Sequence, residues 1–298
     1  MAVIRARPRR RRAIRAGGGG PHYPGWLALP AVGWYALFLL CPLGILAVVS
    51  FSELVGFGSI AYHLNVGNYR ALWDPLYGKV FLRTLRLALF GTSATLLIGF
   101  PLAYYLARWA KRKTLLLLLV VVPFWTSFLI RTYAWLIILD PGFPVLRALR
   151  WIGIVSSNSQ ILFTSKAVYI GVVYNYLPLM VLPLYAALER MDWSLVDAAQ
   201  DLGDSPLRAF RRITLPLTLP GVIAGSLLVF IPLTGEYLNP KILGGDKSIY
   251  AGTLIGQEFL DARDPPFGAA MAMVLIAALT IVIVLYAKLA GRQEQYGG

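Results

Sequence analysis

The sequence predicts an all-α membrane protein with six transmembrane helices, and its composition and the lengths of its apolar segments both indicate this class. Of the 298 residues, 58% are hydrophobic and only 14% are charged, whereas a soluble domain carries about 25% charged residues. The mean hydropathy is +0.65. Such a chain is expected to bury its apolar side chains in a bilayer as well as in its own core.

Six apolar segments have the length that a membrane-spanning helix needs, which is about 20 residues. The fifth segment is interrupted by Pro220, Gly221, Gly225, Pro232 and Gly235, which is typical of a broken membrane helix or of close helix packing. The segments cover residues 26–49, 82–106, 114–139, 167–188, 217–238 and 267–289.

Residues 1–25 form a basic tail that contains seven arginines and the run Gly17–Gly20. Tails of this composition are usually disordered. The apolar segment that follows is longer than the roughly 7–15 residues of a signal-peptide core, so we do not expect cleavage. The tail is predicted to hold the N-terminus in the cytoplasm, with a contact to acidic lipid or nucleic acid as the less favoured alternative. Residues 26–298 then form one six-helix domain.

The distribution of positive charge predicts the orientation. With the N-terminus inside and six spans, 17 of the 28 Lys and Arg residues lie on the cytoplasmic side. The short connection of residues 108–113 alone carries four of them. Under the positive-inside rule, both termini are therefore expected in the cytoplasm.

Motifs of soluble catalysis are missing from the sequence. It has no GxxxxGK[ST], HExxH or GxSxG pattern and no metal-ligand spacing. Cys41 is the only cysteine, and His22 and His63 are far apart. We therefore predict that the chain is not an enzyme and holds no metal or cofactor. If it performs active transport, a partner or an ion gradient must supply the energy.

The longest polar interruption of the apolar pattern covers residues 189–216. Leu195, Val196, Ala199 and Leu202 are spaced as one apolar face of a helix. Asp192 or Ser194 could cap the start of this helix, and glycine 203 could end it, because glycine tolerates positive φ.

A second short helix is expected over residues 207–213, with Ser205 as its cap and Pro206 in its first turn. It would carry Arg208, Arg211 and Arg212. The stretch thus predicts a helix–turn–helix on the cytoplasmic membrane surface, and a solvated connector fits the same pattern equally well.

A resemblance separates these two interpretations. Asp197-Ala198-Ala199, then Gly203, Ile213 and Leu215-Pro216, resembles the EAA motif of binding-protein-dependent ABC importer permeases of type I. The departure is Asp197, where that family usually has Glu. The resemblance implies the type I fold and a coupling helix that docks on an ATP-binding subunit. The implied docking residues are Asp197, Ala198, Ala199, Gly203, Ser205 and Arg208.

The same resemblance implies the partners and the location. Two ATP-binding subunits would hold ATP and Mg²⁺, a second homologous permease would complete the membrane part, and an extracytoplasmic binding protein would deliver the solute. The chain would lie in the bacterial inner membrane and work by alternating access. A secondary transporter that works alone is the rival class, and a membrane-embedded enzyme is a third.

Two further motifs narrow the solute. Residues 123–127 (Pro-Phe-Trp-Thr-Ser) and 131–135 (Arg-Thr-Tyr-Ala-Trp) are similar to spermidine/putrescine importer permeases. Residues 235–237 (Gly-Glu-Tyr), followed by Gly244-Gly245, are also similar to that group. The resemblance implies a polyamine as solute, with iron, thiamine, a phosphonate or an opine as alternatives.

The candidate pathway residues are mostly aromatic or ionisable. A continuous third helix would place Arg131 about 26 Å from its inner end, near the outer interface, where it could snorkel or line the pathway. Glu236 is expected at a similar height, and an ion pair between the two is one possibility. The aromatic residues could equally form an interfacial belt. The candidates are Trp125, Arg131, Tyr133, Trp135, Asn175, Glu236 and Tyr237.

Overall fold

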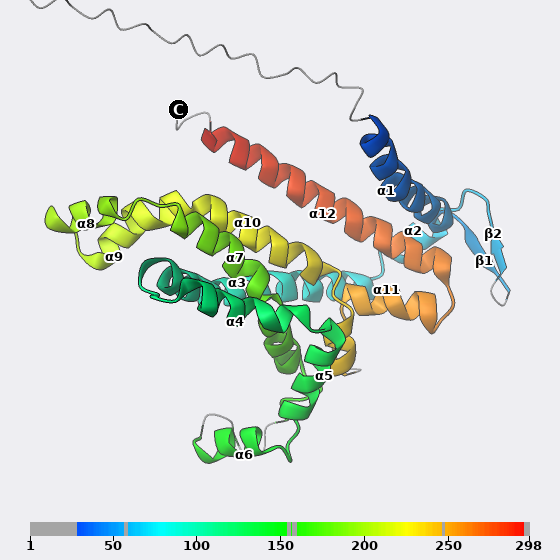
Figure 1. Ribbon diagram of the computed structural model, residues 1–298. Helices are drawn as coiled ribbons and strands as arrows, with labels where there is room; N and C mark the ends of the chain where they lie inside the picture. The colour runs from blue at the N-terminus through cyan, green and yellow to red at the C-terminus, as the bar shows by residue number, and fades with distance from the viewer. Residues whose placement is uncertain (1–28, 57–58, 154–155, 157–159, 246–247, 295–298) are drawn as a thin grey trace, which may run out of the picture. The chain divides into compact units, whose positions relative to one another are not determined.

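The computed structural model describes residues 29–56, 59–153, 156, 160–245 and 248–294 (Figure 1). The chain divides into two units, residues 1–45 and residues 46–298. The basic tail lies outside the described residues. Long α-helices dominate the described part, which confirms the all-α class.

Helix α1 (Leu29–Ser50) begins in the first unit and corresponds to the first predicted span. It is apolar all round, as expected of a helix that contacts lipid. Trp34 and Phe38 lie one turn apart on it, with ring centroids 4.3 Å apart.

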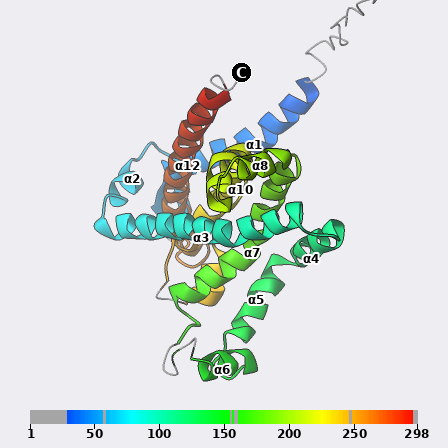
Figure 2. The ribbon, with the colours of Figure 1, turned by 90° about the vertical axis from the view of Figure 1, so that its left-hand side faces the viewer.

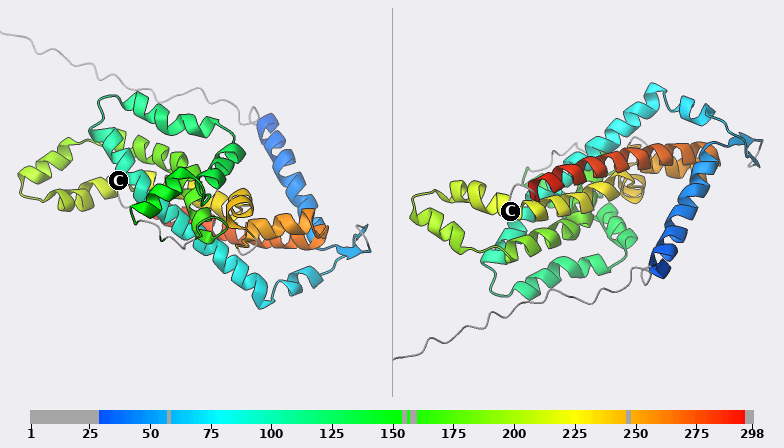
Figure 3. Two further views of the ribbon diagram at one scale, coloured as in Figure 1. Left: turned by 90° about the horizontal axis from the view of Figure 1, so that it is seen from below. Right: turned by 90° about the horizontal axis from the view of Figure 1, so that it is seen from above.

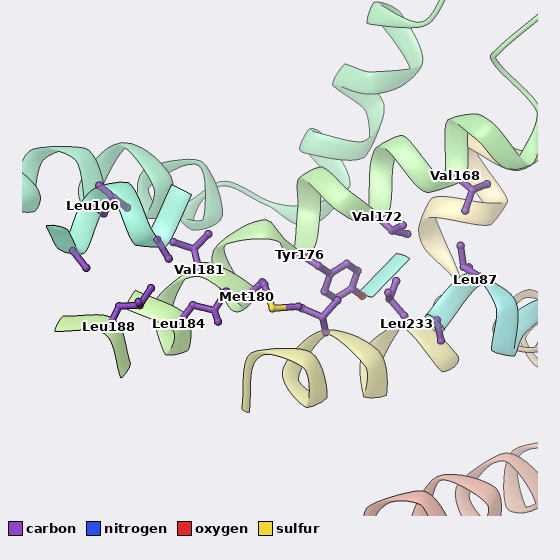
Figure 4. Close-up of a cluster of buried hydrophobic side chains, with 14 of the residues drawn as sticks. Leu87, Leu106, Val168, Val172, Tyr176, Met180, Val181, Leu184, Leu188 and Leu233 are labelled. Carbon is purple, nitrogen blue, oxygen red and sulfur yellow. The ribbon is translucent and has the colours of Figure 1, made fainter. Parts of the chain in front are cut away.

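Three long helices, α3, α7 and α10, pack against one another and form the core of the second unit (Figure 1). Asp74 starts α3 by accepting a hydrogen bond from the backbone N–H of Leu76 at 2.8 Å. Figure 4 shows that the α7 side chains Met180, Val181, Leu184 and Leu188 lie in this core together with leucines of α3 and α10. The bounds are Pro75–Arg108 for α3, Ser165–Glu189 for α7 and Leu215–Thr234 for α10.

Close approach of α7 and α10 explains a glycine of the fifth predicted span. A Cβ atom at Gly221 would lie 2.5 Å from the Cβ of Ala187 and 2.8 Å from the carbonyl oxygen of Pro183. The two backbones can approach this closely only because glycine has no side chain.

The third predicted span is not one straight helix. It consists of α4 (Lys113–Trp125) and α5 (Phe128–Ile138), which are bent by 94° relative to each other. Figure 1 shows this bend, and Figure 2 shows α5 leading from α4 toward α6. Thr126 and Ser127 have extended backbone at the break, and the apolar pattern alone could not reveal it. The expectation of a continuous third helix was therefore wrong.

The fifth span also ends earlier than predicted. Helix α10 stops at Thr234, and residues 235–237 are not helical before the chain turns into η3 (Pro240–Gly244). Helix α11 (Ala251–Leu260) and the last span, α12 (Pro265–Glu294), follow. Because Pro232 and Gly235 both disfavour helix, the early end has a local cause.

The predicted outer connections contain short strands and helices that were not predicted from the sequence. Strand β1 (Glu53–Val55) pairs antiparallel with β2 (Ser59–Ala61), with Leu54 opposite Ile60. Helices α2 (Gly67–Ala71) and α6 (Pro144–Trp151) lie in the first and second connections.

The number of spans agrees with the prediction if the bent pair is counted as one. Five described helices are long and apolar enough to cross a membrane, and α4 with α5 makes a sixth.

Candidate functional site

The loop of residues 189–216 forms a helical hairpin that projects beyond the ends of α7 and α10 (Figure 3). It contains α8 (Ser194–Asp201) and α9 (Pro206–Ala209). The second helix continues through η2 (Phe210–Thr214) into α10, so the expected separate helix over residues 207–213 is instead the start of the fifth span.

The turn between α8 and α9 depends on Gly203, whose φ is +95°. This is the left-handed conformation that glycine adopts at little cost, so the predicted helix end is confirmed. At the other end of α8, Asp192 Oδ1 accepts a hydrogen bond from the backbone N–H of Ser194 at 3.0 Å. Hydrogen bonds from Ser194 lower the pKa of the Asp192 carboxyl, because they stabilise its charged form.

The hairpin is attached to the end of α3 by an ion pair. Arg108 Nη2 donates a hydrogen bond to Asp197 Oδ1 at 2.8 Å. The guanidinium of Arg108 also lies 5.0 Å from the ring centroid of Trp193. Tyr104 of α3 packs edge-on against the same ring at 5.4 Å. Asp197, a predicted docking residue, is therefore paired within its own chain.

The apolar residues of α8 do not share one face. Val196 is buried with Met191 and Ala209 in a small cluster, and Ala199 packs partly against it. Leu202 is 90% exposed. Leu195 is exposed as well, so the predicted apolar face is only partly covered within this chain.

The remaining predicted docking residues lie on the surface of the hairpin. Ala198, Ser205 and Arg208 are exposed. Arg208 pairs with Asp204 at 3.4 Å, and so does Arg212. Ser205 occupies the cap position of α9 but its side chain makes no cap hydrogen bond. The hairpin therefore presents polar side chains together with three exposed leucines, Leu195, Leu202 and Leu207.

A groove of 560 Å³ lies beside the hairpin, between the C-terminal end of α7 and the N-terminal half of α10. Its lining is apolar except for Arg190 and Asp192.

Several polar side chains are buried together where α5 and α7 meet the turn after α10. Asn175 Nδ2 donates to Thr132 Oγ1 and to Asn239 Oδ1, both at 3.2 Å. Asn175 Oδ1 and Asn239 Nδ2 have no hydrogen-bond partner. Of the three residues, only Asn175 was predicted as a site residue.

Glu236 lies in the same buried turn. Its Oε1 accepts hydrogen bonds from the backbone N–H groups of Leu238 at 3.0 Å and Asn239 at 3.2 Å. Its Oε2 accepts a hydrogen bond from the hydroxyl of Tyr176 at 2.5 Å. We refer to Glu236, Tyr176, Asn175, Thr132 and Asn239 as the buried polar cluster.

Arg131 does not snorkel and does not pair with Glu236. It is buried on α5, with its guanidinium 5.1 Å from the ring centroid of Phe124 and 5.8 Å from that of Phe128. Phe124 belongs to α4, so this contact spans the 94° bend. The distance of about 26 Å from the inner end assumed a straight helix, and the bend removes this assumption.

The predicted aromatic pathway residues lie in different environments. Trp125 and Tyr133 are exposed. Trp135 packs edge-on against Tyr174 at 5.4 Å. Tyr237 lies against α11, where a Cβ atom at Gly256 would be 2.6 Å from its ring. The structure does not gather these four side chains around one point.

Within the described residues, no group of three or more His, Cys, Asp and Glu side chains could hold a metal ion.

Comparison with known proteins assigns the family. The model of the binding-protein-dependent transport system inner membrane component matches residues 95–295. The chain belongs to this family. The permease is therefore an inner-membrane component of an ABC transport system, and its family is not itself catalytic.

Relatives extend the match over nearly the whole permease. It is 41% identical over 256 residues to the spermidine/putrescine transport system permease protein PotB of Escherichia coli. The aligned residues cover 86% of this chain and 93% of the relative. The protein of the same name from Haemophilus influenzae is 40% identical over 254 residues, covering 85% and 89%.

A solved structure has the same fold. The bacterial alginate ABC transporter in complex with an alginate pentasaccharide-bound periplasmic protein contains a chain that matches with a TM-score of 0.64 and 19% identity. The match covers 90% of the permease and 95% of that chain. This likeness confirms the predicted transmembrane fold.

Sequence reasoning missed four residues of these two regions. Arg108 entered only as part of a positive loop, and Tyr176, Thr132 and Asn239 were not singled out. Tyr176 follows Asn175 directly, and Asn239 comes three residues after Glu236. Polar residues this close to a predicted site residue inside an apolar segment were the available signal.

Proposed function

We propose that the permease moves polyamines, spermidine and putrescine, across the bacterial inner membrane as part of an ATP-driven importer. One observation carries the proposal, which is the 41% identity to a spermidine/putrescine permease over 93% of that relative's length. The buried carboxylate of Glu236 supports it, because a cationic solute needs a negative partner inside the membrane.

The substrate is tested by uptake into proteoliposomes that contain the permease with its cognate partners and binding protein. We expect radiolabelled spermidine or putrescine to accumulate, and an excess of the unlabelled polyamine to compete. Accumulation of thiamine, ferric iron, a phosphonate or an opine, without polyamine uptake, would assign the alternative solute instead.

Two ATP-binding subunits are proposed to dock on this permease and on a second, homologous one, while an extracytoplasmic binding protein delivers the solute. ATP and Mg²⁺ would be held by the docked subunits. The docking surface is the 189–216 hairpin, with Asp197, Ala198, Ala199, Gly203, Ser205 and Arg208. This assignment requires both termini in the cytoplasm, as the charge distribution predicts.

The contacts of the hairpin suggest how a push on it reaches the membrane helices. Arg108 fixes α8 to the end of α3. The π-helical segment η2 ends at Thr214 and is followed directly by α10, with no loop between them. Movement of the hairpin would therefore move α3 and α10 together, and these helices carry the core.

Leu202→Arg tests the docking surface. Leu202 is 90% exposed at the hairpin tip, so a charge there should leave folding intact and block a close protein contact. The matched control is Leu64→Arg, since Leu64 is 91% exposed in the connection after β2. We expect Leu202→Arg to abolish co-purification of the ATP-binding subunit and Leu64→Arg to retain it. Equal retention by both variants would contradict docking at the hairpin.

The pathway is proposed to include Asn175 and Glu236, with Trp125, Tyr133, Trp135 and Tyr237 as aromatic walls suited to a polyamine cation. Arg131 is positive like the solute, and its guanidinium lies on the rings of Phe124 and Phe128. We therefore propose that Arg131 stabilises the bend between α4 and α5 and does not contact the solute.

A further inference from the structure

The carboxylate of Glu236 lies deep in the membrane-spanning bundle, although it follows the end of α10 in sequence. It is bonded to Tyr176, which comes eleven residues after the first residue of α7. At 1.5 Å per residue, this is about 16 Å along a helix of roughly 37 Å. Figure 4 shows the Tyr176 ring pointing from α7 toward Leu233 of α10. Glu236 therefore lies near mid-depth of the bundle.

The two oxygens of Glu236 have different surroundings. Oε1 accepts two backbone N–H groups and holds the turn that leads to η3. Within the described part of the chain, Oε2 accepts one hydrogen bond, from the hydroxyl of Tyr176. A carboxylate oxygen has two lone pairs, so Oε2 can accept one more donor.

Among the described residues, no cation forms an ion pair with that carboxylate. No ion pair of the described residues includes Glu236. Arg131 lies instead over the rings of Phe124 and Phe128. A buried charge without a counter-charge is costly, and in a transporter its partner can be the solute.

A second, independent observation in the same cluster is a buried oxygen acceptor that no hydrogen-bond donor reaches. The side-chain oxygen of Asn175 has no hydrogen-bond partner, and this residue is 1% exposed. Its neighbour Tyr176 holds Glu236, and its amide nitrogen holds Asn239 of the Glu236 turn. An alkylammonium group has three N–H donors and no acceptor, which suits the unpartnered oxygen of Asn175 and the remaining lone pair of Glu236 Oε2.

We infer that Glu236 is the counter-charge for an ammonium group of the solute, and that Tyr176 is a positioning residue that aims Oε2 at it. This inference rests on the proposed polyamine function. Glu236 is 6% exposed, so the site is closed in this conformation and opens when the turn moves away from α7. Asn175 supplies the second acceptor.

The test uses the complete transporter in proteoliposomes, with saturating binding protein and spermidine as the probe. Glu236→Gln keeps the shape but loses the charge, and we expect uptake to fall at least about tenfold. Tyr176→Phe should raise the half-saturating spermidine concentration several-fold with little change in the maximal rate. Glu236→Asp should retain part of the uptake. The control Glu258→Gln, a half-buried carboxylate on α11, should behave as the unaltered protein.

A second measurement separates recognition from folding. Spermidine without binding protein should raise the Tm of the detergent-solubilised complex, and Glu236→Gln should abolish this rise while its own Tm and its partners stay unchanged. If Glu236→Gln and Glu236→Asp both unfold the complex, Glu236 is only a cap of its turn and the inference is wrong. Unaltered uptake by Glu236→Gln would overturn it as well. Failure of the unaltered transporter to take up spermidine would instead overturn the proposed function, and the inference with it.

Discussion

The hairpin of residues 189–216 and the buried polar cluster both concentrate polar side chains in an apolar chain, but their surroundings are opposite. At the hairpin, Asp197 pairs with Arg108 of α3, and Asp204 pairs with Arg208. These pairs lie near water and can exchange partners at low cost. In the cluster, each hydrogen bond lies in the interior, where an unsatisfied group is expensive. The comparison teaches that the hairpin is suited to reversible contact with a protein and the cluster to selection of a small solute.

The largest expected difference concerns two glycines. A Cβ atom at Gly252 would lie 2.5 Å from the carbonyl oxygens of Glu236 and Gly235, whereas one at Gly203 would meet nothing within 4 Å. We expect Gly252→Ala to destabilise the permease by about 3 kcal/mol, since backbone atoms must shift. Gly203→Ala should cost only about 1 kcal/mol, through its positive φ. Thermal unfolding in detergent measures both, and equal losses would contradict the comparison.

The second prediction compares the replacement of a buried amide side chain with that of an exposed one. Asn175→Leu replaces the amide by an apolar side chain and removes two buried hydrogen bonds. We expect a loss of about 2 kcal/mol in stability. Gln200→Leu on the exposed side of α8 is the control, with a change within about 0.5 kcal/mol. If Asn175→Leu proves as stable as the control, the cluster does not contribute to stability.

The third prediction concerns the attachment of the hairpin to α3. Arg108→Ala removes the Asp197 partner and the contact with Trp193. Because the pair is partly exposed, stability should change by about 1 kcal/mol or less, while ATP-driven uptake should fall several-fold. Lys113→Ala is the control, because its pair with Glu189 lies outside α8 and α9. If uptake fell equally in both variants, the positive charge of the loop would be the cause, and the attachment of α8 to α3 would not be.

The smallest effect concerns pH. Hydrogen bonds from Ser194 depress the pKa of Asp192 in the folded state, so the stability that they add is present above the unfolded value, about 3.9. It is lost as the pH falls through the lower folded pKa. The stability of Asp192→Asn should depend less on acid pH than that of the unaltered permease, as measured by Tm between pH 3 and 6. Identical pH profiles would show that these hydrogen bonds do not contribute to stability.

The hairpin was largely predictable from sequence because its signals are local. Gly203 needs positive φ, and the spacing from Asp197 to Pro216 repeats a motif within 20 residues. The cluster was not predictable in the same way. The break at Thr126 and the early end of α10 at Thr234 change the course of the chain before Arg131 and Glu236. Thr132, Tyr176 and Asn239 meet only through tertiary packing, which no local pattern encodes.

The central claim is that a partner's ATP hydrolysis, received at the hairpin, drives solute past the buried carboxylate. The most direct test measures spermidine uptake into proteoliposomes of the complete transporter, with ATP enclosed on the hairpin side and no ion gradient. We predict accumulation that requires ATP, and its loss in Leu202→Arg but not in Leu64→Arg. Accumulation without ATP, driven by an ion gradient alone, would contradict the account and assign the permease to secondary transport.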